Sequence, residues 1–140
     1  MSQAIGSQAG PADAVREYDD VRRVVQLFLD GESKGDAAKL REASHPDARL
    51  FGSVGGTRYD MPMATFIELA EKEPGDTGNH RTRILSVQHA GDAAVAEAAE
   101  EGYWGSLSLI DYFQLARIEG TWKVVSKLFA HTGGDVPAST

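Results

Sequence analysis

The sequence predicts an α+β fold in which three helices are combined with an antiparallel sheet. An amphipathic pattern begins at Asp13, with apolar residues three and four positions apart, which indicates a long helix. Apolar segments separated by glycine-containing turns follow in the second half of the chain, and these are typical of β-hairpins. The length of 140 residues suits one domain.

The long first helix is expected to begin at Asp13 and to end near Asp30 and Gly31. Residues 1–12 are small and polar, so we expect a flexible arm there. The helix presents one apolar stripe, and Val24 and Leu27 widen it. The stripe consists of Val15, Tyr18, Val21, Val25 and Phe28.

Two shorter helices are predicted after the first. Gly35 suits a helix C-terminal cap and Asp36 suits the N-cap of the next helix, so a second helix is expected over residues 37–44. The segment that follows predicts two short strands joined by a turn at Gly55 and Gly56. A third helix, with an aspartate as its cap, is expected over residues 61–72.

The rest of the domain, which is expected to span residues 13–132, predicts four strands. They cover residues 81–90, 93–103, 106–118 and 121–131, and residues 133–140 are expected to form a flexible tail. Because two-residue turns fix the register of a hairpin, they also predict the cross-strand pairs. These pairs include Val87 with Ala96, Arg83 with Glu100, Asp111 with Ala98, Leu115 with Val124 and Phe113 with Ser126.

This register gives the sheet two different faces. One face is mostly apolar and should meet the helices, with Asp111 as an isolated carboxylate and with Ser126, Arg83 and Glu100 as its other polar members. The opposite face is mixed and should meet solvent or another subunit. It is expected to carry Glu97, Tyr103, Tyr112, Gln114, Lys123, Lys127, Phe129 and His131.

Composition excludes several classes of function. With 14 basic and 21 acidic residues the net charge is −7, so we expect no nucleic-acid partner. The absence of cysteine excludes disulfides, thiolate metal sites and cysteine nucleophiles. No apolar run approaches the roughly 20 residues of a membrane span, and no signal-peptide pattern is present, so we expect a cytoplasmic protein without a membrane partner.

Motifs for cofactors and metals are also missing. The segment GSVGG precedes a predicted strand rather than a helix, so it predicts a turn rather than a phosphate loop, and we expect no cofactor. The four histidines, His45, His80, His89 and His131, form no HxH or HxxxH pair. We therefore expect no metal site.

The order of elements and three segments resemble a known superfamily. HPDARLFG, GDAAVAEA and DYFQLARIEGTWKVVSKLF, in this order after the first two helices, resemble the nuclear-transport-factor-like superfamily, and within it the SnoaL-like "putative lumazine-binding" family. The similarity covers residues 14–131. It implies a cone-shaped, curved antiparallel sheet wrapped around the long helix, with a pocket under that helix and homodimerisation through the outer face of the sheet. Relatives range from isomerases, cyclases and dehydratases to binding domains, so the fold leaves the function open.

Two residues are candidates for proton transfer. Burial of the Asp111 carboxyl on an apolar face would raise its pKa and make it a proton donor, as in steroid isomerases, which the segment IDYF resembles. The alternative is a structural aspartate paired with an arginine, a serine or a backbone amide. His45 is a candidate general base, but its position before a proline also suits a structural corner.

The comparison with steroid isomerases also argues against that reaction. The resemblance places their catalytic tyrosine at Phe28, which has no hydroxyl group, and their aspartate base at Gly52. Two of the three catalytic groups are therefore missing, and isomerisation by that mechanism is not expected.

Three hypotheses for function remain. The first is a cofactor-free protein that binds a small apolar or aromatic molecule, with a lumazine-like compound among the candidates. The second is an enzyme of the polyketide-cyclase, dehydratase or isomerase type that uses Asp111 for proton transfer, and the third is a protein-interaction module. The candidate ligand-binding residues, most of which also suit an ordinary core, are Tyr18, Phe28, Phe51, Phe113, Trp122, Ser126 and Arg83.

Overall fold

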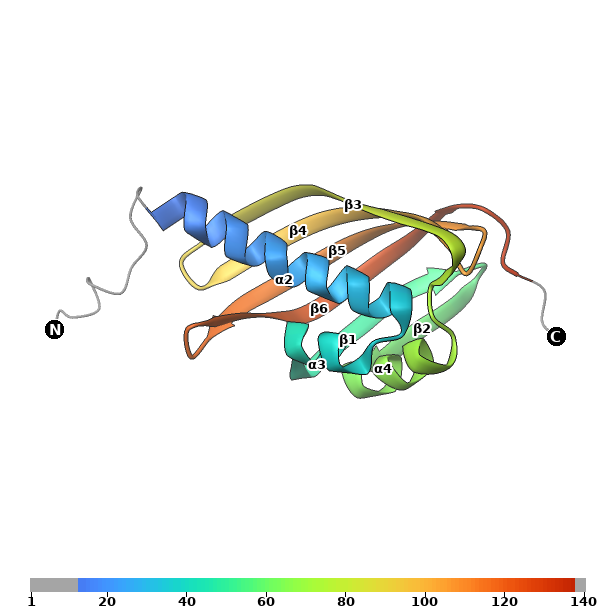
Figure 1. Cartoon of the computed structure of the whole chain (residues 1–140), viewed down its shortest axis with the longest axis horizontal. Helices are drawn as coiled ribbons and strands as arrows, with labels where there is room; N and C mark the ends of the chain where they lie inside the picture. Colours follow the sequence, from blue (N-terminus) through green and yellow to red (C-terminus); the bar gives the residue numbers. More distant parts are fainter. Residues whose placement is uncertain (1–12, 138–140) are drawn as a thin grey trace, which may run out of the picture.

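The computed structural model describes residues 13–137 and shows three helices packed against a six-stranded sheet (Figure 1). This arrangement confirms the predicted α+β class. The predicted arm lies outside the described residues, as do the last three residues of the predicted tail. The elements are α2 (Ala14–Lys34), α3 (Ala37–Ala43), β1 (Ser44–Val54), β2 (Thr57–Pro62), α4 (Met63–Lys72), β3 (Asp76–Ala90), β4 (Ala93–Tyr103), β5 (Leu107–Ile118) and β6 (Thr121–Gly133).

The sheet has the strand order β2-β1-β6-β5-β4-β3 and is mixed rather than purely antiparallel. All neighbouring strands are antiparallel except β1 and β6, which run parallel. Helix α2 crosses one face of the curved sheet, and α3 and α4 lie together near β1 (Figure 1). None of the described helices combines the length and the apolar character that a membrane crossing requires.

Helix α2 is longer than the sequence predicts. It continues past Asp30 and Gly31 to Lys34, where Gly35 adopts a left-handed conformation with φ 68°. Gly31 is a packing residue rather than a helix end, because a Cβ atom there would lie 2.9 Å from Cγ of Leu40. The additional turn carries Glu32, whose side chain is buried, into the interior.

The shorter helices differ from prediction by one or two residues. The Asp36 carboxylate accepts a hydrogen bond from the backbone N–H of Lys39, so the predicted N-cap of α3 is confirmed. The predicted cap of α4 is wrong. Asp60 belongs to β2, where its carboxylate accepts a hydrogen bond from Arg49, and Pro62 extends that strand before the helix begins.

The predicted register holds near the turns and fails beyond bulges. The pairs Val87 with Ala96, Ala98 with Asp111 and Leu115 with Val124 are confirmed. In β3, one additional residue at Leu85 shifts the pairing, so Glu100 lies opposite Thr82 rather than Arg83. The predicted pair of Arg83 with Glu100 is therefore wrong, and Arg83 is exposed.

A second bulge reverses the predicted faces of β6. Val125 is an additional residue in that strand, so Phe113 lies opposite Lys127 rather than Ser126. Lys127, expected on the outer face, is buried on the inner face with 4% exposure. Leu128, which the predicted register places inside, is half-exposed.

A third bulge lies in β4 between Glu100 and Tyr103, where Gly102 has φ 72°. Tyr103, also expected on the outer face, is buried as a result. Phe129 on β6 likewise contacts the buried core rather than the outer surface alone.

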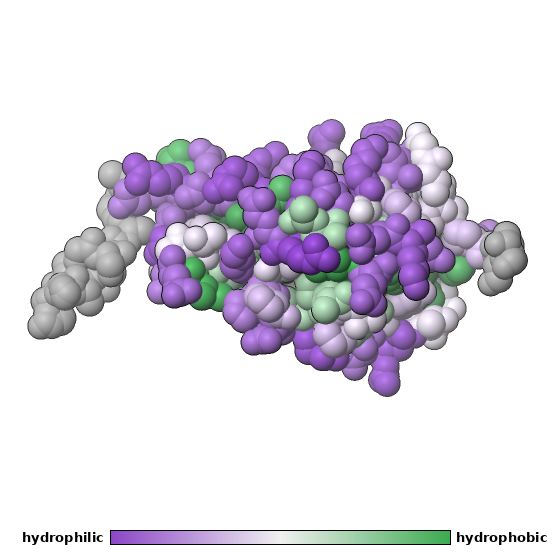
Figure 2. Space-filling model, turned by 60° about the horizontal axis from the view of Figure 1, so that its bottom comes forward, coloured by the Kyte–Doolittle hydropathy of each residue, from purple (hydrophilic) through white to green (hydrophobic). Residues whose placement is uncertain are grey.

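The core fills the space between α2, α4 and the inner face of the sheet. Phe28 of α2 is fully buried, stacks on Phe66 at a centroid distance of 6.0 Å, and meets Phe113 edge-on at 5.3 Å. Hydrophilic side chains cover most of the surface shown in Figure 2, where apolar side chains appear as small separate patches.

Candidate functional site

The most unusual feature of the interior is a group of ionisable side chains on the inner face of the sheet. We call Glu32, His80, Glu100, Asp111 and Lys127 the buried charged cluster. Each comes from a different element: α2, β3, β4, β5 and β6, respectively. All five side chains have between 0% and 4% exposure. Isolated charges are strongly disfavoured at such depth, so their mutual contacts decide their state.

Lys127 occupies the centre of the cluster. Its Nζ atom donates a hydrogen bond to Glu32 Oε1 at 2.6 Å and lies 3.5 Å from Glu100 Oε2 and 3.7 Å from Asp111 Oδ1. Four phenylalanine rings surround the same ammonium group, with centroids 5.4 to 5.7 Å from Nζ, a distance at which cation–π attraction operates. They belong to Phe28, Phe66, Phe113 and Phe129.

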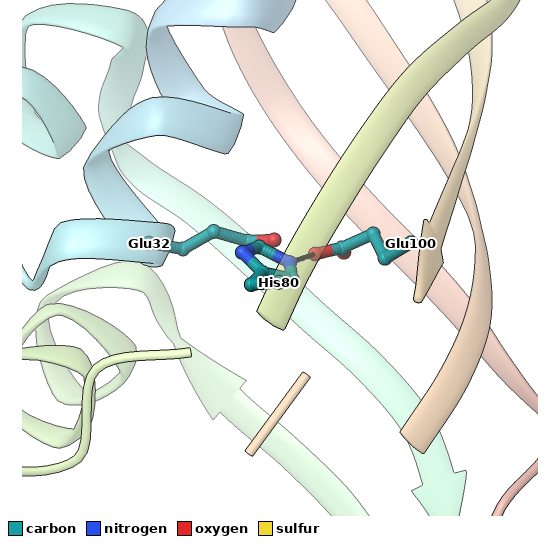
Figure 3. A group of neighbouring side chains, drawn as sticks. All are labelled: Glu32, His80 and Glu100. Atoms are coloured by element: carbon teal, nitrogen blue, oxygen red, sulfur yellow. Dashed lines mark hydrogen bonds and ion pairs between the residues drawn. The ribbon is translucent and has the colours of Figure 1, made fainter. Parts of the chain in front are cut away.

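His80 connects the cluster to the C-terminal turn of α2. Its Nε2 atom lies 2.8 Å from Glu100 Oε1, and its Nδ1 atom lies 2.8 Å from the hydroxyl of Ser33. Figure 3 shows the ring between the carboxyl groups of Glu32 and Glu100, which approach it from α2 and β4. Both ring nitrogens therefore have polar partners inside the fold.

The irregular start of β3 determines the position of His80. The Asp76 carboxylate accepts hydrogen bonds from the backbone N–H groups of Gly78 and His80, at 2.8 and 3.2 Å. The Lys34 ammonium lies 2.7 Å from the same carboxylate. Hydrogen bonding to Lys34, and then to the two amides, holds the pKa of Asp76 well below its usual range. The predicted strand begins only at residue 81, so the structure extends it by residues 76–80.

Contacts within the cluster shift the pKa values of its three carboxyl groups in different directions. Burial, followed by the negative charge of Glu100, raises the pKa of both Glu32 and Asp111. Burial also opposes ionisation of Glu100, but the charge of Lys127 outweighs it, and the pKa of Glu100 is well below its usual range. Burial likewise opposes the charge of Lys127, yet the three carboxyl groups hold its pKa well above the usual value. Their contacts thus favour the ionised form of Glu100 and Lys127 and shift Glu32 and Asp111 toward the protonated form.

A small cavity of about 40 Å³ lies next to Lys127. It lies between α4 and five strands, rather than under α2 as the resemblance implied. Its volume suits one small chemical group or a water molecule. Lys127 and Tyr103 are the residues of the lining with strongly polar groups near the charged cluster. The lining consists of Leu50, Val54, Tyr59, Met61, Phe66, Leu69, Tyr103, Trp104, Leu107, Leu109, Lys127 and Phe129.

The structure brings three of the sequence-predicted site residues to the cluster. Asp111 is fully buried and belongs to the cluster, and its neighbour is a lysine rather than the arginine, serine or amide that we considered. Phe28 and Phe113 contribute two of the rings around Lys127. These three residues come from α2 and β5, whose inward faces the sequence predicted correctly.

The other predicted site residues lie elsewhere. His45 lies in a surface groove between α3 and α4, and its Nδ1 atom accepts a hydrogen bond from the backbone N–H of Asp47, as in a structural corner. Trp122 is buried, and its indole N–H donates to Glu17. Within the described part of the chain, these side chains do not line the cavity at Lys127. The same holds for Tyr18, Phe51, Ser126 and Arg83.

The sequence did not predict four residues as members of the site: Glu32, His80, Tyr103 and Lys127. One of them left a signal in the sequence, because Glu32 follows Phe28 by four positions and so continues the apolar stripe of α2. A glutamate on that stripe indicates a buried carboxyl group. The inward positions of Lys127 and Tyr103 result from bulges, and the position of His80 results from the irregular start of β3. These irregularities leave no comparable pattern in the sequence.

The structure also explains why the catalytic groups of the steroid isomerases do not fit here. Phe28 presents a bare ring to Lys127, without a hydroxyl. At Gly52, a Cβ atom would lie 2.5 Å from the backbone oxygen of Phe129 and 2.6 Å from its ring, so an aspartate has no room at that position.

The chain belongs to the family described as "Putative lumazine-binding", whose model matches residues 16–130. This finding confirms the family resemblance. Solved structures of NTF2-like proteins share the fold of this chain.

Three solved structures illustrate the similarity. An NTF2-like protein of unknown function from Shewanella baltica is 25% identical, with a TM-score of 0.77, 86% of this chain covered and 98% of that chain. Another from Methylobacillus flagellatus is 24% identical, with a TM-score of 0.78, 86% of this chain covered and 95% of that chain. A ketosteroid isomerase-like protein from Erwinia carotovora is 15% identical, with a TM-score of 0.67 and coverage of 84% and 97%. Together they confirm the cone-shaped NTF2-like fold.

Among characterised proteins, the chain is similar to Aldolase FrzH from Cladobotryum sp. The two are 21% identical over 113 residues, which cover 81% of this chain and 90% of that protein. The comparisons therefore identify an NTF2-like protein of the family described as putative lumazine-binding.

Asp111→Asn is expected to flatten the pH dependence of stability. In the wild type the folded pKa of Asp111 is raised, so the folded state keeps a proton that the unfolded state releases above about pH 3.9. This group therefore reduces stability as pH rises, with a limiting slope of about 1.4 kcal/mol per pH unit until the folded pKa is reached. Asparagine does not titrate, so the variant should gain stability relative to the wild type between pH 4 and 8, as measured by urea denaturation.

The matched control for this prediction is Asp47→Asn, because the Asp47 side chain is 93% exposed. Its stability should follow the wild-type pH curve. Parallel curves for Asp111→Asn and the wild type would mean that Asp111 stays ionised in the folded protein.

Proposed function

We propose that this protein binds a small, largely apolar molecule in the cavity beside α4 and transfers protons at a carbonyl group of that molecule. The observation that carries the proposal is Lys127. Its ammonium group borders an apolar cavity and is backed by three buried carboxyl groups. A positioned cation can stabilise the oxygen of a developing enolate, and neighbouring acids of different strength can exchange protons with the ligand.

The charged cluster offers both an acid and a base for this chemistry. Neighbouring titratable groups whose pKa values are pushed apart are typical of acid–base sites. The pKa values of Glu32 and Asp111 are raised, which suits groups that both donate and accept protons, whereas Glu100 favours the ionised form and balances the charge of Lys127. Lys127 contacts all three carboxyl groups and the cavity, so it connects them to the ligand.

The cavity wall supplies the rest of the binding site. Burial raises the pKa of the Tyr103 hydroxyl, which therefore stays protonated and can donate a hydrogen bond to a carbonyl oxygen. The cavity admits only the small carbonyl end of a ligand in its present shape. The remainder would pack on aromatic rings of the lining, such as Tyr59, Trp104 and Phe129, once these rings move apart.

The comparisons support the same class of chemistry. Aldol reactions begin with removal of a proton next to a carbonyl group, and one relative is named an aldolase. The family description points to lumazine, a ring compound, as a candidate ligand. We therefore propose an aldehyde, a ketone or a carbonyl-bearing ring compound as the ligand, as an extension of the polyketide-cyclase, dehydratase or isomerase hypothesis.

The test is a panel of lumazine, flavin-like, steroid and polyketide-like carbonyl compounds. Binding is followed by thermal shift, and proton transfer by NMR detection of deuterium incorporation next to the carbonyl group in heavy water. We expect at least one compound to stabilise the protein and to exchange its proton faster than in buffer, with loss of exchange in Lys127→Met. Lys123→Met, which alters a lysine outside the cluster, is the control.

The outcomes separate the hypotheses. Stabilisation without exchange would support the binding protein and contradict the catalytic role. If no compound in the panel stabilised the protein or exchanged its proton, the proposed function would be contradicted. If exchange persisted in Lys127→Met, Lys127 would have no role in proton transfer.

We also propose that the outer face of the sheet forms a homodimer interface. Phe51, Tyr112 and Leu128 lie side by side there by strand register and are 45%, 48% and 50% exposed. Such adjacent apolar side chains favour an interface. Sedimentation equilibrium should show a dimer for the wild type and for the control Val15→Glu, whose residue lies on α2, but a monomer for Leu128→Glu. A monomeric wild type would contradict this proposal.

A further inference from the structure

We infer that Glu32, His80 and Glu100 form a binding site for one divalent transition-metal ion that accepts nitrogen and oxygen ligands, such as Zn²⁺. One donor atom from each of the three side chains lies within 4.8 Å of the other two. Figure 3 shows the imidazole ring of His80 between the two carboxyl groups, which reach it from α2 and β4. This inference does not depend on the proposed function.

The first supporting observation is a free donor atom inside the cluster. Glu32 Oε1 accepts the hydrogen bond of Lys127, but Glu32 Oε2 is buried and has no hydrogen-bond partner. Both carboxyl oxygens of Asp111 are in the same condition. Buried polar atoms without partners are costly and rare, so the unpartnered oxygen of Glu32 indicates room for a ligand that binds carboxylate oxygens.

The charge of the cluster gives the second argument. When the three carboxyl groups are ionised and the His80 ring is neutral, Glu32, Glu100 and Asp111 carry three negative charges, whereas Lys127 supplies one positive charge. The difference is two negative charges in a volume without solvent, which one divalent cation balances. In its absence, protons have to balance the same charge. Metal binding should therefore release protons from the carboxyl groups.

The environment of His80 supports metal ligation by its ring. The Ser33 hydroxyl lies 2.8 Å from Nδ1 and can fix the ring, while Nε2 faces Glu100 Oε1 at 2.8 Å, so one metal ion could be ligated by both atoms in place of their hydrogen bond. Such a partner on the second nitrogen is usual for histidines that ligate metals. A donor set of one imidazole and two carboxylates suits Zn²⁺, Mn²⁺ or Fe²⁺ better than metals that prefer thiolates.

Lys127 limits the affinity of the proposed site for a metal ion, and its replacement tests the proposal. Its ammonium group competes with the metal for Glu32 and Glu100, because it lies 2.6 and 3.5 Å from their oxygens. Removing this charge while keeping an apolar stem, as in Lys127→Met, should make Zn²⁺ bind at least tenfold more tightly. A site that involves only surface histidines should not respond to this change.

The experiment is isothermal titration of the full chain with Zn²⁺ in two buffers of different ionisation enthalpy. We expect one ion per chain, with release of protons, and at least tenfold weaker binding by Glu32→Gln and by His80→Gln. His89→Gln is the control, because His89 lies on β3 outside the cluster. Its affinity should equal that of the wild type.

A second measurement does not depend on how well the variants fold. In NMR spectra of the wild type, one equivalent of Zn²⁺ should shift the ring signals of His80 and leave those of His89 in place. Failure of Zn²⁺ to bind, equal binding by wild type and His80→Gln, or shifts confined to the other histidines would each overturn the inference. The cluster would then be balanced by shared protons alone.

Discussion

Lys127→Met is expected to lower the free energy of unfolding by about 3–5 kcal/mol near pH 7, the usual cost of removing one partner from a buried ion pair. The substitution keeps an unbranched side chain among the four phenylalanine rings, so the loss of packing is small. It leaves Glu100, which is ionised in the wild type, buried next to Glu32 and Asp111 without a cation. The loss of the positive charge therefore accounts for most of the expected decrease in the free energy of unfolding.

The stability that Lys127→Met loses relative to the wild type should increase as the pH rises. In the wild type the depressed pKa of Glu100 contributes stability above the unfolded pKa of about 4.3, and this is lost as pH falls through the lower folded pKa. Without Lys127, burial raises the folded pKa of Glu100, so stability is lost as pH rises above about 4.3. The deficit should thus be smallest near pH 4 and largest near pH 8.

Urea denaturation of both proteins between pH 4 and 8 measures this difference. Lys123→Met is the matched control and should show no such trend, because Lys123 lies outside the cluster. The double variant Lys127→Met with Glu100→Gln should recover part of the lost stability. A deficit that is constant across the pH range would mean that Lys127 acts through packing rather than through its charge.

The fold could be predicted because its signals are local. The stripe of α2, the Asp36 cap and the Gly91 and Gly120 turns each lie within a few residues of the feature they determine. Register could be counted outward from the turns as far as Ala96 and Val124. Beyond those points a single additional residue moves every later side chain to the other face.

The site could be predicted only in part, for the same physical reason. Asp111 alternates regularly with Phe113 and Leu115 along β5, so its inward position could be predicted. Lys127 lies beyond the bulge at Val125, and Tyr103 lies beyond the one near Gly102. The bulges are long-range consequences of sheet curvature, whereas the patterns used for prediction are short-range.

These irregularities and the chemistry of the site are connected. A regular β6 would have placed Ser126 on the inner face and Lys127 on the outer face, as we predicted. The bulge reverses them and gives three buried carboxyl groups a cation within 3.7 Å. The same kind of local departure brings Tyr103 to the cavity, so the polar groups of the site enter the interior where the sheet is least regular.

Phe28→Ala is the other substitution with a large expected effect, a loss of about 3–5 kcal/mol in the free energy of unfolding. Phe28 is fully buried, stacks on Phe66 and meets Phe113 edge-on. Its ring centroid also lies 5.4 Å from Nζ of Lys127, so the substitution removes one of the four rings around that ammonium group. The space left behind lies next to the charged cluster.

Thermal and urea denaturation measure this loss, with Tyr18→Ala as the control, because Tyr18 is an aromatic residue of the same helix and is 39% exposed. That control should cost about 1 kcal/mol or less. Phe28→Leu should fall between the two, since it restores apolar volume but not the ring above Lys127. If Phe28→Leu were as stable as the wild type, volume alone would explain the role of Phe28. A remaining deficit in Phe28→Leu that disappears in the Lys127→Met background would instead assign that part to the contact between the ring and the ammonium group.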